Sequence, residues 1–246
     1  MKKFLIVVLV IMSLYTVSDA RKLTIMSYNL HHCEGMDKKL DEDRIARIIS
    51  ANAPDVVAVQ ELDSVTTRCS AYQMQVLGEK TGMHYTFAKS IDFGGGKYGV
   101  GMLSKEKPIC VKRIPLPGAE SRVLLICEFK NYYYACTHLC LKAENRMKSL
   151  PLILEQAELA DKPFIIAGDW NAKPQEKFIV EMNEYFDFIS DNQVPTFPSG
   201  KPRVCIDYIA VYKNSLKKGF RVKNYKVLEE KVASDHCPVK AVVTLK

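Results

Sequence analysis

Apolar runs of strand length recur along this chain and dominate its pattern. Clear examples are KLTIMSYNL at 22–30, DVVAVQEL at 55–62 and PFIIAG at 163–168. Further strand patterns are HYTFAKS, YGVGMLS, PICVKRI, RVLLICEF, YYYACTHL, VCIDYIAVY and CPVKAVVTLK. Short β-type runs of this kind predict strands, and the middle group is typical of antiparallel neighbours. The chain must therefore build much of its core from β-sheet.

Helical patterns interrupt the strands at four places, over residues 38–54, 70–82, 144–160 and 173–184. Pro54 ends the first pattern, and Pro151 must kink the third or start a new turn in it. Strands and helices mixed in this order predict an α/β (α+β) fold of two packed sheets covered by helices. The chain shows no internal repeat, low-complexity tract or linker, so we predict one domain over residues 21–246.

The first twenty residues follow a different pattern. Two lysines precede an apolar core from Phe4 to Met12, and the segment closes on small residues at Ser18 and Ala20. This is typical of a cleaved signal peptide. A membrane anchor is the alternative, but the apolar core is shorter than the roughly 20 residues that span a bilayer. We expect a signal peptide over residues 1–20, no membrane span, and export to the periplasm or the medium.

Polar side chains gather where the strand patterns end or begin. Four runs end in polar pairs or triplets, at Tyr28–Asn29, Gln60–Glu61, Thr137–His138 and Asp169–Asn171. Two late strands carry such residues at or before their start, at Asp207 and at Ser234–His236. Antiparallel late strands bring their starts to the same rim as the ends of the others. Loops at such a rim can converge on a site while the strands stay rigid.

The triplet Asp169-Trp170-Asn171 has two interpretations. In extended backbone Asp169 and Asn171 project on one face, and Trp170 turns into packing. Asp169 and Asn171 could then hold a metal-bound water and a phosphoryl oxygen. A turn explains the triplet equally well, because Asp and Asn are ordinary turn residues. Taken singly, Glu61 is as easily a solvated carboxylate and His138 a structural histidine. Only the conjunction of these residues, in one order along the chain, favours a site.

That ordered set carries a resemblance. The motifs NLHH, DVVAVQE, YGVGMLS, THL, IIAGDWNA, IDYI and SDHCPV resemble, in this order, those of the endonuclease/exonuclease/phosphatase superfamily. The superfamily includes pancreatic-type deoxyribonucleases, abasic-site endonucleases, neutral sphingomyelinases, inositol-polyphosphate phosphatases and deadenylases. The small form with NLHH and a glycine-rich loop resembles exported bacterial metal-dependent hydrolases. The resemblance covers about residues 23–245 and implies a four-layer sandwich of two mixed, mostly antiparallel sheets between helices.

The resemblance also implies roles for individual residues. It makes Glu61 the principal ligand of Mg²⁺ or Mn²⁺, with Asn29 beside it and Asp235 as a further ligand. Asp169 matches the carboxylate that orients or deprotonates the attacking water, and Asn171 the amide that binds the phosphate. The remaining matches are His236 on a phosphoryl oxygen, Asp207 as its carboxylate partner, His138 as the second histidine, and Arg122 and Tyr98 as substrate contacts.

Two features depart from the family pattern. His31 stands where abasic-site endonucleases carry an aspartate, which puts a second metal position in doubt and makes His31 a substrate contact or an unconventional ligand. The glutamate that pairs with the first histidine in the nuclease branch has no counterpart near Tyr98. This weakens a specific deoxyribonuclease interpretation.

Charge and cysteine content leave the substrate open. The formal net charge of +7 is a mild basic excess that suits an anionic partner but does not require one. All eight cysteines follow residue 20, and several lie in apolar runs, where cysteine is commonly a small buried hydrophobe. No C-x-x-C pair supports a structural zinc site. We expect one or two disulfides at most.

The leading hypothesis is therefore an exported, monomeric, metal-dependent phosphoester hydrolase, nuclease-like in its chemistry. Its substrate is a nucleic acid, a phospholipid, as in a sphingomyelinase, or an inositol or sugar phosphate. The last of these would need a tight basic pocket, for which Lys97, Arg122 and Lys201 are available. A non-catalytic binding module on the same fold is the alternative from another class.

Overall fold

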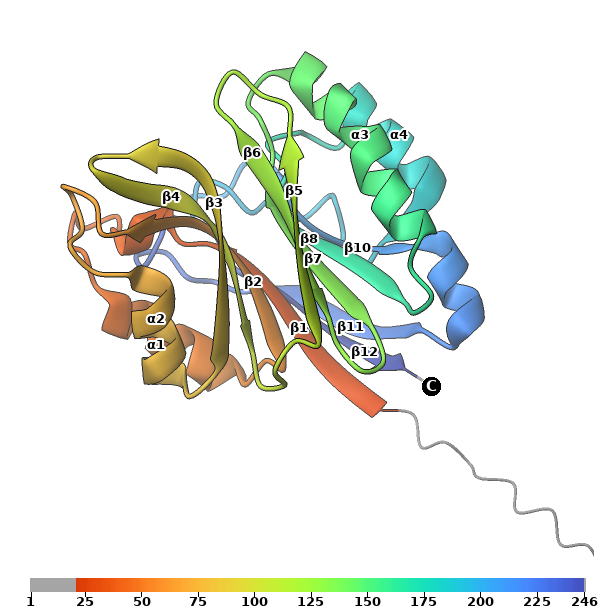
Figure 1. Ribbon diagram of the computed structural model, residues 1–246, viewed down its shortest axis with the longest axis horizontal. Coiled ribbons are helices and arrows are strands. Elements are labelled where there is room, and N and C mark those ends of the chain that lie inside the picture. Colours follow the sequence, from red (N-terminus) through yellow and green to blue (C-terminus); the bar gives the residue numbers. More distant parts are fainter. Residues whose placement is uncertain (1–20, 246) are drawn as a thin grey trace, which may run out of the picture.

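The structure, a computed structural model, describes residues 21–245. Within this range the strands form two six-stranded sheets (Figure 1). From one edge to the other, the first sheet contains β11 (Arg221–Val227), β12 (Val239–Leu245), β1 (Arg21–Asn29), β2 (Val56–Ser64), β4 (Gly96–Ser104) and β3 (His84–Phe93). The second contains β5 (Cys110–Leu116), β6 (Arg122–Glu128), β7 (Tyr133–His138), β8 (Phe164–Asp169), β10 (Asp207–Tyr212) and β9 (Phe186–Phe188).

Helices cover the outer face of each sheet (Figure 1). Those on the first sheet are α1 (Glu42–Asn52) and α2 (Gln73–Thr81), and those on the second are α3 (Ala143–Glu158) and α4 (Lys177–Tyr185). Two 3₁₀ turns, η1 (His31–Cys33) and η2 (Lys213–Lys218), follow β1 and β10.

Side chains that alternate along each strand pack on both faces of the sheet, toward the other sheet and toward the helices. In β1, Leu23 and Ile25 face the core between the sheets, whereas Met26 and Tyr28 face α1 and α2, because successive strand side chains point to opposite faces. The Tyr134 hydroxyl donates to the Met26 carbonyl across the two sheets at 2.9 Å. The predicted four-layer sandwich is confirmed.

The strand directions bring many strand ends to one edge of the sandwich. β1 and β2 run parallel, and so do β7 and β8. β12 is antiparallel to β1, and β10 is antiparallel to β8. The carboxyl ends of four strands and the amino ends of two others therefore share one edge.

The element boundaries differ from the predicted ones in a few places. α1 begins later than its pattern suggested, because the Asp41 side chain accepts a hydrogen bond from the Arg44 backbone N–H at 2.8 Å and caps the helix at that point. α3 continues through Pro151 without starting a new turn. This proline is exposed, so water can bind the carbonyl group that loses its helical partner.

The expected one or two disulfides are not formed. All eight cysteines lie within the described residues and are free. Most are separated by layer: Cys33 packs under α1 and Cys205 on the α4 side of the second sheet. Even Cys127 and Cys136, on the paired strands β6 and β7, are offset by two residues in register.

The predicted signal peptide, residues 1–20, lies outside the described residues. Among residues 21–245, no helix combines the length and the apolar character that a membrane crossing requires.

Candidate active site

The sheet registers bring the predicted polar side chains to one edge. His138, Asp169 and Asp207 occupy neighbouring positions across β7, β8 and β10, since Asp169 pairs with both of the others. In the other sheet, Asn29 pairs with Gln60 at the ends of β1 and β2. The loop before β12 adds residues 234–236. Both sheets therefore contribute side chains to the same cluster.

Asn29 connects the two halves of the cluster. Its buried Nδ2 donates to Glu61 Oε1 at 2.9 Å and to Asp169 Oδ2 at 3.1 Å. His236 Nε2 lies 3.4 Å from the same nitrogen. The other end of the amide is also fixed, because Asn29 Oδ1 accepts from the His31 backbone N–H at 3.0 Å. One asparagine thus holds two carboxylates from different sheets at a defined separation.

Glu61 reaches this position through an irregularity in β2. The register between β2 and β4 shifts between Val59 and Leu62, and Glu61 has a left-handed φ of 59°. A bulge of this kind re-aims a side chain and is common beside active sites. Positive φ is uncommon outside glycine, so the surrounding pairing must stabilise it. The Glu61 side chain remains half-buried.

The triplet Asp169–Asn171, which begins with the last residue of β8, is both a turn and part of the cluster. Asp169 Oδ1 accepts from the Asn171 backbone N–H at 2.9 Å, and the Asn171 amide donates to the Leu139 carbonyl at 3.0 Å. Trp170 turns away into full burial against Phe178 and Tyr208. Gly168 precedes the turn because a Cβ at this position would lie 1.9 Å from the Thr137 carbonyl oxygen. The two interpretations of the sequence therefore describe the same piece of backbone.

His236 forms a buried pair with a carboxylate. Its Nδ1 lies 2.9 Å from Asp207 Oδ2 and 3.1 Å from Asp207 Oδ1. Burial alone would lower the pKa of His236, but the carboxylates of Asp207, Asp169 and Asp235 together raise it to about 10. The three carboxylates therefore favour the charged imidazolium form of His236.

His138 has the opposite surroundings. Arg122 Nη1 lies 3.3 Å from His138 Nδ1, and His138 Nε2 lies 3.4 Å from Asp169 Oδ2. Burial, with the Arg122 guanidinium and His236, lowers the pKa of His138 well below its usual range. Since a guanidinium only donates, Nδ1 must accept and Nε2 must carry the proton. Arg122 thereby fixes the neutral tautomer that donates toward Asp169.

The other predicted residues lie at the margin of the cluster. Tyr98 pairs with Asp63, two residues after Glu61, and burial and the Glu61 carboxylate raise the pKa of its hydroxyl well above the usual value. Asp235 Oδ1 is 4.0 Å from His236 Nε2. His31 turns away, because its Nδ1 pairs with the Glu34 carbonyl at 3.0 Å and its ring packs on His32.

Two supporting residues had no role assigned to them from the sequence. Thr196 donates its hydroxyl to Asp207 Oδ2 at 2.5 Å, the same oxygen that lies 2.9 Å from His236 Nδ1. Ser234 donates to the Asn29 carbonyl at 2.7 Å and accepts from the His236 backbone N–H at 3.2 Å. Ser234 stands in the SDH motif and had a sequence signal, whereas Thr196 lies in a proline-rich loop with none.

A family model, that of the Endonuclease/Exonuclease/phosphatase family, matches residues 26–236, which contain every member of the cluster. The chain belongs to this family. Its members are hydrolases of phosphoesters. No curated protein matches the chain.

Solved structures from several organisms share the family fold. An endonuclease/exonuclease/phosphatase from Beutenbergia cavernae DSM 12333 is 21% identical with a TM-score of 0.73, and the match covers 92% of this chain and 72% of that one. The mannosyl-6-phosphatase of Bacteroides thetaiotaomicron VPI-5482 is 18% identical (TM-score 0.74; 90% and 99% covered). The human Nocturnin catalytic domain, with a bound sulfate anion, is 18% identical (TM-score 0.68; 93% and 97% covered). At these identities the likeness shows the fold alone.

The charge of the cluster fits the divalent cation that the family implies. Among residues 21–245, four carboxylates contact Asn29 or the two histidines and a fifth, Glu120, contacts Arg122, against the cations Arg122 and His236; the four are Glu61, Asp169, Asp207 and Asp235. Glu61, His138 and Asp169 bring one ligand atom each within 4.8 Å of one another. Carboxylate oxygens are ligands that Mg²⁺ prefers, and a sparse protein set leaves room for water. Asn29 presents its Nδ2 to both carboxylates, so ligation by its Oδ1 would require the amide to turn.

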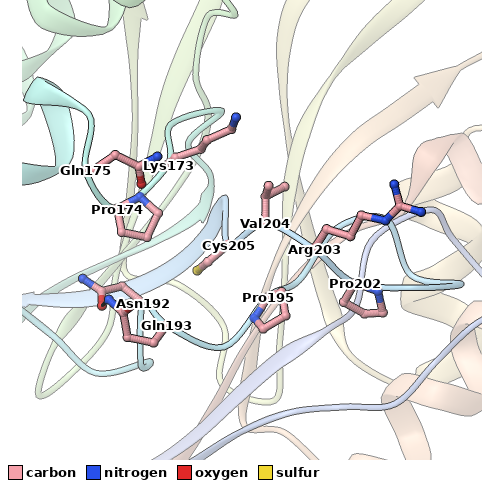
Figure 2. Close-up of a pocket in the computed structure, with 10 residues that line it drawn as sticks. All are labelled: Lys173, Pro174, Gln175, Asn192, Gln193, Pro195, Pro202, Arg203, Val204 and Cys205. Carbon is pink, nitrogen blue, oxygen red and sulfur yellow. Dashed lines mark hydrogen bonds between the residues drawn. The ribbon is translucent and has the colours of Figure 1, made fainter.

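A cavity of about 310 Å³ lies next to the segments that carry Asn171 and Thr196 (Figure 2). Figure 2 shows residues 173–175 facing residues 192–205 across it. Lys173 and Arg203 are its charged members, and both are exposed. This side of the site therefore offers basic groups and several prolines.

Proposed function

We propose that this protein is an exported, metal-dependent phosphoester hydrolase in which water attacks a phosphoryl group. One observation carries the proposal: Asp169, a buried carboxylate, contacts Asn29 and lies within 4 Å of two histidines whose pKa values are shifted in opposite directions. A structural carboxylate needs only one such partner. A convergence of this kind is what in-line attack on a phosphoryl group requires.

Asp169 is placed to orient the attacking water and accept its proton. Burial, more than any neighbour, raises the pKa of this carboxyl group, which makes its anion a stronger base. The Asn171 N–H holds Oδ1, so Oδ2 is the oxygen that faces the cluster. Its direction is fixed before substrate arrives.

The remaining groups can neutralise a phosphoryl oxygen. His138 Nε2 donates without being charged, whereas His236 supplies a charged donor whose far side is held by Asp207. Arg122 adds a buried positive charge behind His138. Together they place donors where negative charge develops in the transition state, and His236 can pass a proton to the departing oxygen.

A bound Mg²⁺ or Mn²⁺ ion would supply further neutralisation of the phosphoryl oxygens. Glu61 is the residue best placed to hold it. We predict that Glu61→Gln raises the Mg²⁺ concentration for half-maximal activity by about tenfold or more, because one charged ligand is lost while the contact with Asn29 can persist.

Two measurements test this role of Glu61. A magnesium titration of phosphodiester hydrolysis gives the half-saturation point, and calorimetric titration with Mn²⁺ gives metal affinity independently of turnover. Glu34→Gln is the matched control, since Glu34 is also half-buried but lies beside His32 and Lys38. Unchanged titrations for Glu61→Gln would exclude Glu61 as the ligand.

A substrate panel tests the activity itself. DNA, RNA, sphingomyelin, phosphatidylinositol, inositol phosphates and sugar phosphates should be assayed with Mg²⁺, with Mn²⁺ and with chelator. The similar folds include proteins named as a mannosyl-6-phosphatase and Nocturnin, so both small and large substrates belong in the panel. If none of these esters is hydrolysed, the result would favour a non-catalytic binding module.

Export rests on the amino-terminal pattern alone. The test is amino-terminal sequencing of the protein recovered outside the cytoplasm, where cleavage after Ala20 would leave Arg21 first. An intact amino terminus would contradict export through a cleaved signal.

A further inference from the structure

A second cavity, of about 340 Å³, is lined by Arg68, Ile91, Phe93, Tyr98 and Glu120. It is built from the loop after β2, the β3–β4 hairpin and the loop before β6. It adjoins the catalytic cluster at two points. Tyr98 pairs with Asp63, two residues after Glu61, and Glu120 Oε2 lies 3.4 Å from Nη2 of Arg122, which contacts His138. A group bonded to a phosphoryl centre at the cluster would extend into this cavity.

Arg68 is held rigidly at the wall of the cavity. Its Nε and Nη2 donate to the two oxygens of Asp63 at 2.6 and 2.9 Å, and the Asp63 side chain is fully buried. Its guanidinium carbon lies 4.4 Å from the Phe93 ring centroid and 5.6 Å from that of Tyr98. The bidentate pair uses two of the three guanidinium nitrogens. Nη1 is left to donate to a ligand.

The lining combines ring surfaces with one acceptor and one fixed donor. Phe93 is 39% exposed and, with Ile91, offers an apolar face. The exposed Glu120 carboxylate accepts hydrogen bonds from hydroxyl groups and repels a second phosphate. A volume of 340 Å³ is at the small end of ligand pockets, enough for one ring rather than a polymer or a lipid.

We propose that this cavity binds the alcohol part of the substrate, and that this alcohol is a neutral polyhydroxylated ring, as in a monosaccharide or inositol phosphate. The inference rests on the proposed hydrolase function and adds its substrate class. The C–H face of the ring packs on Phe93, while its hydroxyl groups donate to Glu120 and accept from Arg68. This assigns the ring to the Tyr98 side of the cluster and not to the basic cavity of Figure 2.

The test compares ring and ringless substrates in the complete protein. Inositol monophosphate and hexose 6-phosphates are the ring substrates, and ethyl phosphate is the ringless reference. Phe93→Ala should raise KM for the ring substrates by about tenfold and leave ethyl phosphate unchanged, since the lost contact is made only by the ring. Lys173→Ala and Arg203→Ala, in the other cavity, should change neither substrate.

The outcomes separate this inference from the proposed function. If ethyl phosphate or a generic diester is hydrolysed with metal but Phe93→Ala has no selective effect, the ring inference is wrong and the hydrolase stands. The same conclusion follows if Lys173→Ala or Arg203→Ala weakens the ring substrates instead. If no ester is hydrolysed at all, the function fails, and calorimetry of inositol monophosphate with wild type and Phe93→Ala still decides whether the cavity binds a ring.

Discussion

His138 and His236 enter the same cluster from different sheets, and their surroundings differ in one respect. Both are buried, with 6% and 4% of their surface exposed, and their Nε2 atoms lie 3.4 and 3.7 Å from the same oxygen, Asp169 Oδ2. At the other ring nitrogen, His138 meets the guanidinium of Arg122 and His236 meets the carboxylate of Asp207. The pKa of His138 is lowered and that of His236 is raised to about 10.

This difference shows that the group behind each imidazole sets its role. Burial alone would make both rings neutral. Asp207 and the neighbouring carboxylates overcome burial at His236, whereas Arg122 reinforces it at His138. The cluster therefore presents one charged and one neutral donor to the same place. Two identical rings would either repel each other as a pair of cations or leave the phosphoryl charge uncompensated.

The largest expected effect comes from removing the Asp169 carboxylate, which lies close to both histidines. Asp169→Asn should lower kcat by about a thousandfold, because the amide cannot accept a proton from water. The near-identical shape should preserve the fold, which circular dichroism and thermal unfolding would check. Asp161→Asn, an exposed change near the opposite end of β8, is the control and should retain full activity. Near-normal turnover by Asp169→Asn would remove Asp169 from the mechanism.

A smaller effect should follow from making the two histidines more alike. Asp207→Asn removes the carboxylate that favours the charged ring of His236 but keeps a group able to contact Nδ1 and Thr196. We expect kcat to fall by about a hundredfold with little change in KM, since the charge on His236 matters most in the transition state.

His236→Ala is the companion variant for this prediction and should lower kcat by about a hundredfold or somewhat more, still less than Asp169→Asn. Combining it with Asp207→Asn should cost no more than His236→Ala alone, because Asp207 acts through the ring. Fully additive losses in the double variant would show that Asp207 has an independent role.

Most of the fold could be predicted because its strands are buried on at least one face. Runs such as residues 163–168 are apolar enough to be recognised as strands without knowing which strands pair with them. Two strands carried no such signal. β9 has only three residues, and β11 is an edge strand whose side chains are almost all exposed, so neither shows alternation.

The parts of the site that could not be predicted depend on geometry between distant segments. Sequence order indicated that Asn29, Glu61 and Asp169 would approach one rim, but the bulge that turns Glu61 inward arises from the register of β2 against β4. The cavity beside Tyr98 joins three separate parts of the chain, and its lining residues other than Tyr98 lie in no motif of the sequence. Opposite pKa shifts at two histidines likewise follow from partners 16 and 29 residues away in sequence.

The smallest expected effect concerns a third buried histidine, His32. It is measured as a change in the free energy of unfolding with pH. Burial, with Arg68 and His31, lowers the pKa of His32 to about 4, and its Nδ1 has no partner among the described residues. The unfolded chain, with a pKa near 6.5 at this residue, then binds more protons than the folded protein between about pH 6.5 and 4, so stability falls as pH falls through that window. The loss amounts to at most about 3 kcal/mol.

We therefore expect His32→Gln to flatten this part of the stability curve. Urea unfolding at pH 7.5, 6.5, 5.5 and 4.5 should show the wild type losing more stability than the variant, with the gap widening toward low pH. His84→Gln, at an exposed histidine of β3, should keep the wild-type slope. Parallel curves for wild type and His32→Gln would mean that His32 protonates as readily in the folded chain as in the unfolded one. The contrast among buried histidines would then be confined to the cluster around Asp169.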